Sequence, residues 1–388
     1  MIEQDIDKID ESDLLLLKEN KVPETKTIEY KQSLPSESPE DKIKFLSGVS
    51  SFSNASGGDY IIGIVEDKGV PKKIEGVEIE DSDKEKLRLE QMIRSNVSPR
   101  IPSINVKTLK LSNGKFVFII RILQSWIRPH RVIFKGHDKF YSRTSAGKYQ
   151  LDVDELRTAF NLTETIKDKI INFRLDRISK IYSNETPIPF IEAAKIVLHF
   201  IPLNSLSSPK DYELNEYFPI NQYPEKIFPI SNTVDWRFNI DGFLAYLLLH
   251  DGKTNRCVQV FRNCIVEFVH AIYENKINSR AFEEEIIEYT SRYLDLLKTI
   301  NVGSPIFMFM TLLGVKDFSL EVENRYKRFP IDRGYKIEKN IFIFPEIIID
   351  DYKVDKARIL KPWFDLLWNS CGYERCFHYD DNKDYIPK

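Results

Sequence analysis

The sequence is poor in cysteine, in long hydrophobic runs and in net charge. Its 388 residues include four cysteines, all in the second half of the chain and irregularly spaced, so we expect reduced thiols and no disulfide framework. The leucine run at residues 14–17 is far too short for a membrane span and lacks the basic start of a signal peptide, so we expect a cytoplasmic protein with no membrane partner. A formal net charge of -3 excludes a surface that is positive throughout, although a local basic surface would suffice to bind a polyanion.

Length and composition predict two domains. The chain is longer than one core usually fills, and its hydrophobic content of 42% supports packing throughout. We expect an acidic N-terminal segment at residues 1–22, a first domain at residues 23–161 and a second domain at residues 162–388. Helical and strand patterns mix without a regular βαβ alternation, which predicts an α+β fold: a mixed or antiparallel sheet with flanking helices, followed by a second α+β domain.

Local signals place the elements of the first domain. Ser38 before Pro39 predicts a helix start, and the helix is expected to end at the Asn54 to Gly58 turn, before a buried strand at residues 59–65. The Asn113-Gly114 pair predicts a hairpin between residues 106–111 and 115–122. Further elements are expected as a charged helix at residues 81–96, a strand at 139–143, and a helix from 153 that Asp152 and Glu155 cap.

The second half carries longer patterns. Apolar spacing predicts helices at residues 165–182, 280–300 and 356–369, and strands within residues 191–203 and 235–249. Residues 205–232 are rich in proline, asparagine and serine and are expected to form a loop.

Carboxylates and a lysine recur at the start of the first domain. Glu24, Glu29 and Lys31 lie near one predicted strand, and the pair Glu66 and Asp67 ends another. Carboxylate oxygens suit Mg²⁺ or Mn²⁺, and such an ion could neutralise a phosphodiester and position the attacking water. Lys31 would stabilise the developing negative charge. The alternative is an edge strand with alternating charges that serve solubility.

The period of a strand adds a geometric condition to this hypothesis. Glu29 and Lys31 share one face, whereas Glu24, five residues earlier, would point away unless the chain bends near residues 23–27. The metal site therefore requires a bend there.

A basic segment at residues 124–148 predicts a nucleic-acid surface. Cations can contact phosphates, and the interleaved aromatic residues Trp126, Phe134, Phe140 and Tyr141 can stack on unpaired bases. In the alternative, the aromatic residues belong to the core and only the cations are exposed. The candidate binding residues are Arg128, His130, Arg131, Lys135, Lys139, Arg143 and Lys148. For His130, a phosphate donor and a residue that braces its loop remain equal alternatives.

Three further patterns are weaker. Backbone donors at Asn54, Gly57 and Gly58 could cradle a phosphate, as in ATP binding, but a turn that needs glycine explains them as well. Cys371, Cys376 and His378 suggest zinc, which Cys257 and Cys264 could complete, but the spacing is poor and buried reduced cysteines are favoured. His199, His250 and His270 lie in apolar runs and are expected to be core residues.

The first domain resembles the Schlafen-type, AlbA-like domain family. Four segments carry the resemblance: the strand with Glu24, Glu29 and Lys31, residues 52–58 with the strand 62–67, residues 125–130, and residues 140–145 before the helix with Asp152 and Glu155. The resemblance implies a metal-dependent endoribonuclease, or else a non-catalytic nucleic-acid-binding or ATP-binding regulator. It does not extend to the second half, for which a signal or protein partner is expected.

The nuclease alternative assigns residues and partners. The resemblance implies three acidic residues: Glu24, Glu29 and Asp67, with Glu66 as the alternative third acid. Its substrate would be structured RNA such as tRNA, and its setting antiviral defence. Because relatives can combine two such lobes into a horseshoe around RNA and this chain has one, a homodimer is expected.

Overall fold

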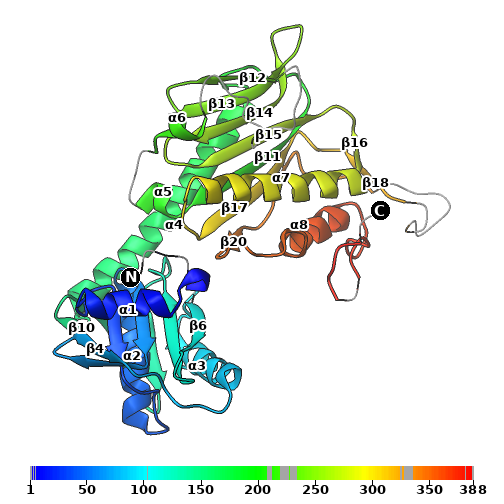
Figure 1. Cartoon of the computed structure of the whole chain (residues 1–388). Coiled ribbons are helices and arrows are strands. Elements are labelled where there is room, and N and C mark those ends of the chain that lie inside the picture. Colours follow the sequence, from blue (N-terminus) through cyan, green and yellow to red (C-terminus); the bar gives the residue numbers. More distant parts are fainter. Residues whose placement is uncertain are drawn as a thin grey trace. The chain divides into compact units, whose positions relative to one another are not determined.

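Helices and strands alternate irregularly along the chain, which confirms the predicted α+β class (Figure 1). The structure is a computed structural model, and it describes all residues except 1, 3, 5, 103, 208–211, 219–226, 228–233, 324–325, 327–334, 381 and 387–388. The chain divides into two units, Met1–Thr165 and Ile166–Lys388. Each unit is described by itself.

The central sheet of the first unit has four strands in the order β1-β2-β7-β6. Strand β1 runs parallel to β2, and the other pairs are antiparallel. The predicted hairpin joins β6 to β7, and Gly114 takes a positive φ of 84° at its turn. The strands are β1 (Ile28–Lys31), β2 (Gly58–Ile62), β6 (Ile104–Lys110) and β7 (Phe116–Ile122).

Helix α2 (Pro39–Asn54) lies between this sheet and a second, antiparallel one. Ser38 caps the helix by accepting a hydrogen bond from the Asp41 amide, as predicted, and the apolar side chains of the helix fill a shared core. The helix contacts β2 and β7 as well as the second sheet. That sheet has the order β10-β9-β8-β5, with β5 (Val97–Ser98), β8 (Arg131–Phe134), β9 (His137–Thr144) and β10 (Gly147–Gln150). Helix α3 (Ser82–Asn96) completes the layer.

The other face of the central sheet is covered by the acidic N-terminal segment. This segment forms the 3-10 helix η1 (Ile6–Lys8) and helix α1 (Glu11–Glu19), whose Leu14 is fully buried. Ile61 faces this side, whereas Tyr60 and Ile62 face α2, as the two-residue period of a strand requires. The N-terminal segment is thus part of the core of the first unit.

The strand predicted at residues 59–65 is two strands. Gly63 adopts a φ of 109°, which ends β2 and starts β3 (Ile64–Asp67). Strand β3 pairs with β4 (Val70–Ile74) instead of continuing the central sheet. The acidic pair Glu66 and Asp67 therefore lies on a separate hairpin.

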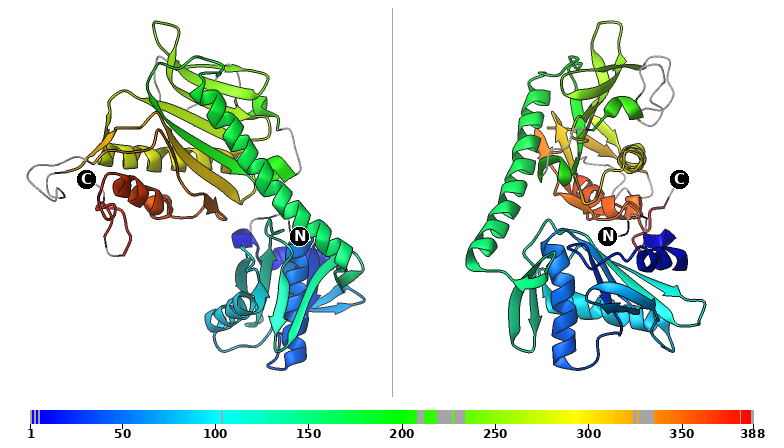
Figure 2. Two further views of the ribbon diagram at one scale, coloured as in Figure 1. Left: turned by 180° about the vertical axis from the view of Figure 1, so that it is seen from behind. Right: turned by 60° about the vertical axis from the view of Figure 1, so that its left-hand side comes forward.

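The second unit is built on an eight-stranded antiparallel sheet in the order β12-β13-β14-β15-β11-β17-β19, with β20 also paired to β17. Figure 2 shows α7 (Ser279–Thr299) and α8 (Lys356–Ser370) on one face and the end of α4 (Val153–Tyr182) on the other. The strands are β11 (Ala194–Pro202), β12 (Val234–Phe238), β13 (Gly242–Leu248), β14 (Thr254–Phe261), β15 (Val266–Ile272), β17 (Ile306–Leu313), β19 (Ile341–Ile343) and β20 (Ile347–Ile349). Two short strands, β16 (Lys276–Asn278) and β18 (Ser319–Glu321), pair in parallel beside it.

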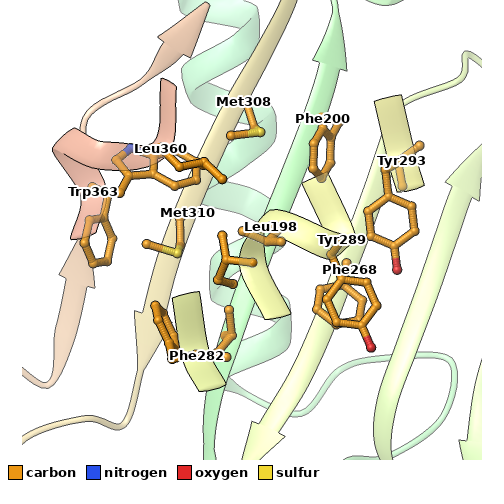
Figure 3. Packing of buried hydrophobic residues seen from close by; sticks show 14 of the residues in the cluster. Leu198, Phe200, Phe268, Phe282, Tyr289, Tyr293, Met308, Met310, Leu360 and Trp363 are labelled. Carbon is orange, nitrogen blue, oxygen red and sulfur yellow. The ribbon is translucent and has the colours of Figure 1, made fainter. Parts of the chain in front are cut away.

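The main core of this unit lies between the sheet and α7 and α8. Figure 3 shows Leu198 and Phe200 of β11 and Met310 of β17 packed against Tyr289 and Trp363 of these helices. The long apolar strands and the amphipathic helices that the sequence predicts meet here.

Two expectations for the connecting regions need correction. The helices expected at residues 153–160 and 165–182 are one continuous helix, α4. The loop expected at residues 205–232 contains two short helices, α5 (Asn204–Ser207) and α6 (Leu214–Tyr217), and the rest of it largely falls outside the described residues. In the described part of the chain, no helix combines the length and the hydropathy that crossing a membrane would require.

Candidate functional site

The chain bends before β1, and the bend brings Glu24 back toward the strand. Thr25 donates its amide to the Ile28 carbonyl at 3.0 Å, and Glu24 donates its own to the Gly69 carbonyl at 2.7 Å. Glu24 Oε1 then accepts the Tyr30 amide at 2.8 Å and lies 3.4 Å from Lys31 Nζ. The geometric condition set by the strand period is therefore met.

Glu29 and Lys31 share one face of β1, and Arg143 of β9 meets them there. Lys31 Nζ lies 2.9 Å from Glu29 Oε1, while Arg143 Nη1 donates to Glu29 Oε2 at 2.8 Å. Burial raises the pKa of Glu29, but the charges and hydrogen bonds of Lys31 and Arg143 outweigh it and hold the pKa below its usual value. Two carboxylates thus converge on one ammonium group. We call Glu24, Glu29, Lys31 and Arg143 the β1 charge cluster.

The third acid does not join the β1 charge cluster. The Asp67 side chain is 62% exposed and lies 3.6 Å from Lys72 Nζ, and Glu66 accepts the amide of Gly69 within its own hairpin turn. The hairpin is close, since Gly69 bonds the Glu24 backbone. Among the described residues, however, neither acid forms with Glu24 and Glu29 a set of ligand oxygens within 4.8 Å of one another.

The cluster can be compared with what a divalent ion requires. The Lys31 ammonium occupies a position between oxygens of Glu24 and Glu29, which is where a cation is electrostatically favoured. Mg²⁺ is commonly held by one or two carboxylates together with water and substrate phosphate. The donor set of Glu24 and Glu29 therefore fits Mg²⁺ or Mn²⁺.

The basic segment separates into exposed and buried cations. Lys135 and Lys139 are exposed, and Arg131 is half-buried and pairs with Asp138 at 2.9 Å. Arg128 is half-buried beside the Ala55 carbonyl, and its burial lowers its pKa. These side chains offer positive charge near the surface of the second sheet.

Lys148 is half-buried next to the β1 charge cluster. Its Nζ donates to the Lys44 carbonyl at 2.6 Å and to Ser47 Oγ at 2.8 Å. Burial lowers the pKa of Lys148 to about 8; the Glu29 carboxylate opposes this change, and nearby cations, including Lys31, add to it.

His130 and Arg143 are buried, so neither side chain lies on an exposed surface. His130 Nδ1 bonds the Pro99 carbonyl at 2.7 Å, and burial lowers its pKa to about 4 although that bond opposes the change. Its main chain is held by Asn54, so His130 braces its loop. Arg143 stacks on Phe52 with its guanidinium carbon 3.6 Å from the ring centroid. Of the aromatic residues, Phe134 and Tyr141 pack against the core.

The glycine turn after α2 is structural. The amides of Ala55 and Gly57 already donate to the carbonyls of Ser51 and Phe52. Gly57 has a φ of 71°, and a Cβ there would lie 2.7 Å from the Ile122 carbonyl oxygen. The turn therefore requires glycine because the backbone approaches β7 closely.

A cavity of about 600 Å³ opens between this turn, β9 and the start of α4. Cations on its wall are Lys26, Arg128 and Arg143. An equal number of acids lines it at the start of α4: Asp152, Asp154 and Glu155. Because Arg143 also bonds Glu29, the cavity adjoins the β1 charge cluster. This cavity could not be predicted from the sequence, since its walls come from segments far apart in the chain.

The three histidines of the second unit that were expected in the core differ in their burial. His199 is fully buried and His270 half-buried, each bonded to a glutamate, whereas His250 is exposed and not a core residue. All four cysteines are buried, and no disulfide joins any two of them. Of the suggested zinc ligands, Cys376 and His378 come together.

Comparison with known proteins finds a similarity within the first unit. Residues 24–152 match the model of the family described as Schlafen, AlbA_2, which confirms the resemblance for this segment. No curated protein matches the chain. Among solved structures, a Corynebacterium diphtheriae protein is 20% identical over 33% of this chain and 22% of its own length, with a TM-score of 0.24. The N-terminal domain of a RecG-related protein from Nitrosomonas europaea is 19% identical over 37% of this chain and 94% of its own, with a TM-score of 0.28.

Proposed function

We propose that the segment matching the Schlafen, AlbA_2 family makes this protein a metal-dependent endoribonuclease that acts at the β1 charge cluster. The observation that carries the proposal is the convergence of Glu24 and Glu29 on Lys31, at 3.4 and 2.9 Å. Carboxylates that share a cation, beside a cavity whose wall includes three cations, are the elements that phosphodiester hydrolysis needs. The proposed substrate is structured RNA such as tRNA, and the proposed setting is antiviral defence.

Each residue has a role that follows from its position. Glu24 and Glu29 would hold Mg²⁺ or Mn²⁺, which when bound supplies charge neutralisation at phosphate oxygens and a water of lowered pKa. Lys31 stabilises negative charge on the phosphate, and Lys26 and Arg128 on the cavity wall position the RNA backbone. Asp67 is proposed as the third acid, since its hairpin is fixed beside Glu24.

Cleavage of total tRNA by the full chain tests the enzyme. The wild-type protein is expected to cut in Mn²⁺ and not in EDTA, and Glu29→Gln is expected to lower the rate at least about a hundredfold. The matched control is Glu37→Gln, because the Glu37 side chain is 80% exposed and lies outside the cluster. Intact tRNA with both Mg²⁺ and Mn²⁺, or equal cleavage by wild type and Glu29→Gln, would contradict the proposal. Glu24→Gln, at a 30% exposed side chain, serves as a second variant if Glu29→Gln unfolds.

A second candidate is a non-catalytic nucleic-acid-binding regulator. It is favoured by the pairing of both Glu29 oxygens, one with Lys31 and one with Arg143, which already neutralises the carboxylate. In this case, RNA binding measured by fluorescence anisotropy would persist with no cleavage in any metal. The second unit would then carry the signal or protein partner.

The proposed homodimer supplies the second lobe that one chain lacks. Sedimentation of the full chain is expected to give twice the mass of one chain, 45.5 kDa. A monomer at the concentration of the cleavage assay would exclude it.

A further inference from the structure

Three side chains of different chemistry meet in the interior of the second unit. Glu283 comes from α7, and Cys376 and His378 come from the segment that follows α8. All three are fully buried, and their ligand atoms lie within 4.8 Å of one another. Glu283 Oε1 is 3.3 Å from Cys376 Sγ, and Glu283 Oε2 is 2.7 Å from His378 Nδ1.

We propose that Glu283, Cys376 and His378 form a binding site for a single transition-metal ion of the zinc class. Ligand atoms about 2.0 to 2.3 Å from a tetrahedral zinc lie roughly 3.5 Å from one another. The sulfur already has that distance from the Glu283 carboxylate, and the imidazole would move outward by less than about 1 Å. A thiolate, an imidazole and a carboxylate together favour zinc over Mg²⁺ or Ca²⁺, which prefer oxygen ligands alone.

The other nitrogen of His378 gives an independent indication. His378 Nε2 is buried and has no hydrogen-bond partner among the described residues. A carboxylate oxygen, Glu323 Oε1, lies 3.7 Å away and is held by Arg280 at 2.8 Å. A metal-bound histidine usually directs its second N–H to a carboxylate, which orients the ring. Coordination through Nδ1 would leave the Nε2 proton pointing to Glu323.

The surroundings support a closed site. The His378 ring lies against Tyr326 and Trp368, with centroids 5.5 and 5.2 Å away, and Trp368 Nε1 donates to Glu283 Oε1 at 2.8 Å. The ring contacts hold the imidazole in place, and the Trp368 hydrogen bond fixes the carboxylate. On binding, the Cys376 thiol releases its proton to solvent, and His378 binds as the neutral imidazole. The ion would tie the segment after α8 to α7.

The sulfur ligand makes the test specific. All four cysteines belong to the second unit: Cys257, Cys264, Cys371 and Cys376. A metal ion at the β1 charge cluster of the first unit would therefore have no cysteine sulfur among its ligands. We therefore design the test on the full-length protein, loaded with zinc and then desalted. X-ray absorption at the zinc edge should show one sulfur ligand at about 2.3 Å with nitrogen and oxygen ligands. Either of two results with the wild-type protein alone would overturn the proposal: bound zinc with no sulfur ligand, or loss of the zinc on desalting.

Variants then locate the ligands. Cys376→Ser and His378→Ala are expected to reduce retained zinc from about one ion per chain to less than about 0.2. Cys371→Ser is the matched control, because Cys371 is also buried, is close in sequence and lies outside the group. His378→Cys, which supplies another zinc ligand, is expected to restore binding and so to separate lost coordination from misfolding. Equal retention by wild type and Cys376→Ser would show that Glu283 only accepts hydrogen bonds from its neighbours.

Discussion

Arg143 and Glu29 form an ion pair of 2.8 Å, in which the Arg143 side chain is 3% exposed and the Glu29 side chain 11%. The two residues join β9 of the second sheet to β1 of the first, 114 residues apart in the chain. Arg143 also donates to the Thr25 carbonyl, within the bend that positions Glu24. The pair therefore connects the predicted basic segment to the acidic site, and it does so inside the protein.

Loss of this pair should destabilise the first unit. Arg143→Met leaves Glu29 with Lys31 as the remaining cation of the cluster, and removing one partner of a buried pair costs about 3 to 5 kcal/mol. Because Lys31 remains, we expect about 3 kcal/mol, measured as protection against hydrogen exchange in β1 and β9. The matched control is Arg131→Met on the neighbouring strand, whose pair with Asp138 is about half exposed and should contribute at most about 1 kcal/mol. Equal losses would show that burial of the pair does not matter.

Asn54 should stabilise the backbone segments beside the cavity. Its amide donates to the carbonyls of His130 and Tyr141, both at 2.8 Å, and accepts the His130 amide at 2.7 Å. Asn54→Ala removes these three hydrogen bonds, although the His130 carbonyl still accepts from Ser50 Oγ at 3.0 Å. We expect a loss of about 2 kcal/mol and faster proteolysis at residues 125–130. Asn96→Ala is the control, because Asn96 bonds within its own helix. Unchanged proteolysis would contradict the role of Asn54.

Elements set by local signals could be predicted from the sequence. The cap at Ser38, the Asn113-Gly114 turn and the shared face of Glu29 and Lys31 depend on residues a few positions apart, and all are present. The continuity of α4 was not predicted, because separate sequence signals indicate its start at residue 153 and its second part at residues 165–182.

Contacts between distant segments could not be predicted in this way. An arginine on a strand next to other cations is usually exposed, and nothing near Arg143 in the sequence indicates Glu29. For the same reason, Glu283 could not be predicted as a neighbour of Cys376, which follows it by 93 residues. Spacing in the sequence suggests the other cysteines as metal ligands beside Cys376, whereas the fold places Glu283 next to it.

Lys148 should make RNA binding depend on pH above neutrality. Its pKa is lowered to about 8, so the side chain loses its positive charge as the pH rises through that value. One phosphate contact is worth about fourfold in affinity near 0.15 M salt, so binding of a non-cleavable 2′-O-methyl RNA should weaken about fourfold between pH 7 and pH 9. Lys148→Arg should remove this pH dependence, and Lys148→Met should bind weakly at both values. A wild-type affinity that does not change with pH would contradict the prediction.

Glu267 should make the second unit sensitive to acid. Burial raises the pKa of this carboxyl, but hydrogen bonds and charges from Arg177 and His199 outweigh it and lower the pKa to about 2. Because the folded-state pKa lies below the unfolded one, the stabilisation is present above about pH 4.5 and is lost as the pH falls toward 2. The loss should be on the order of 3 kcal/mol. Tryptophan fluorescence follows this unit well, since Trp236, Trp363 and Trp368 all belong to it.

Comparison of two glutamine variants isolates this effect. Glu267→Gln should lower the free energy of unfolding at pH 7, because Arg177 then loses its charged partner at 2.8 Å, and should flatten its decline between pH 5 and pH 2. Glu274→Gln, at an exposed position, should follow the wild type at every pH. If wild type and Glu267→Gln declined in parallel, the acid sensitivity would reside in other carboxyls. The ion pair that fixes α4 to β15 would then be independent of pH in this range.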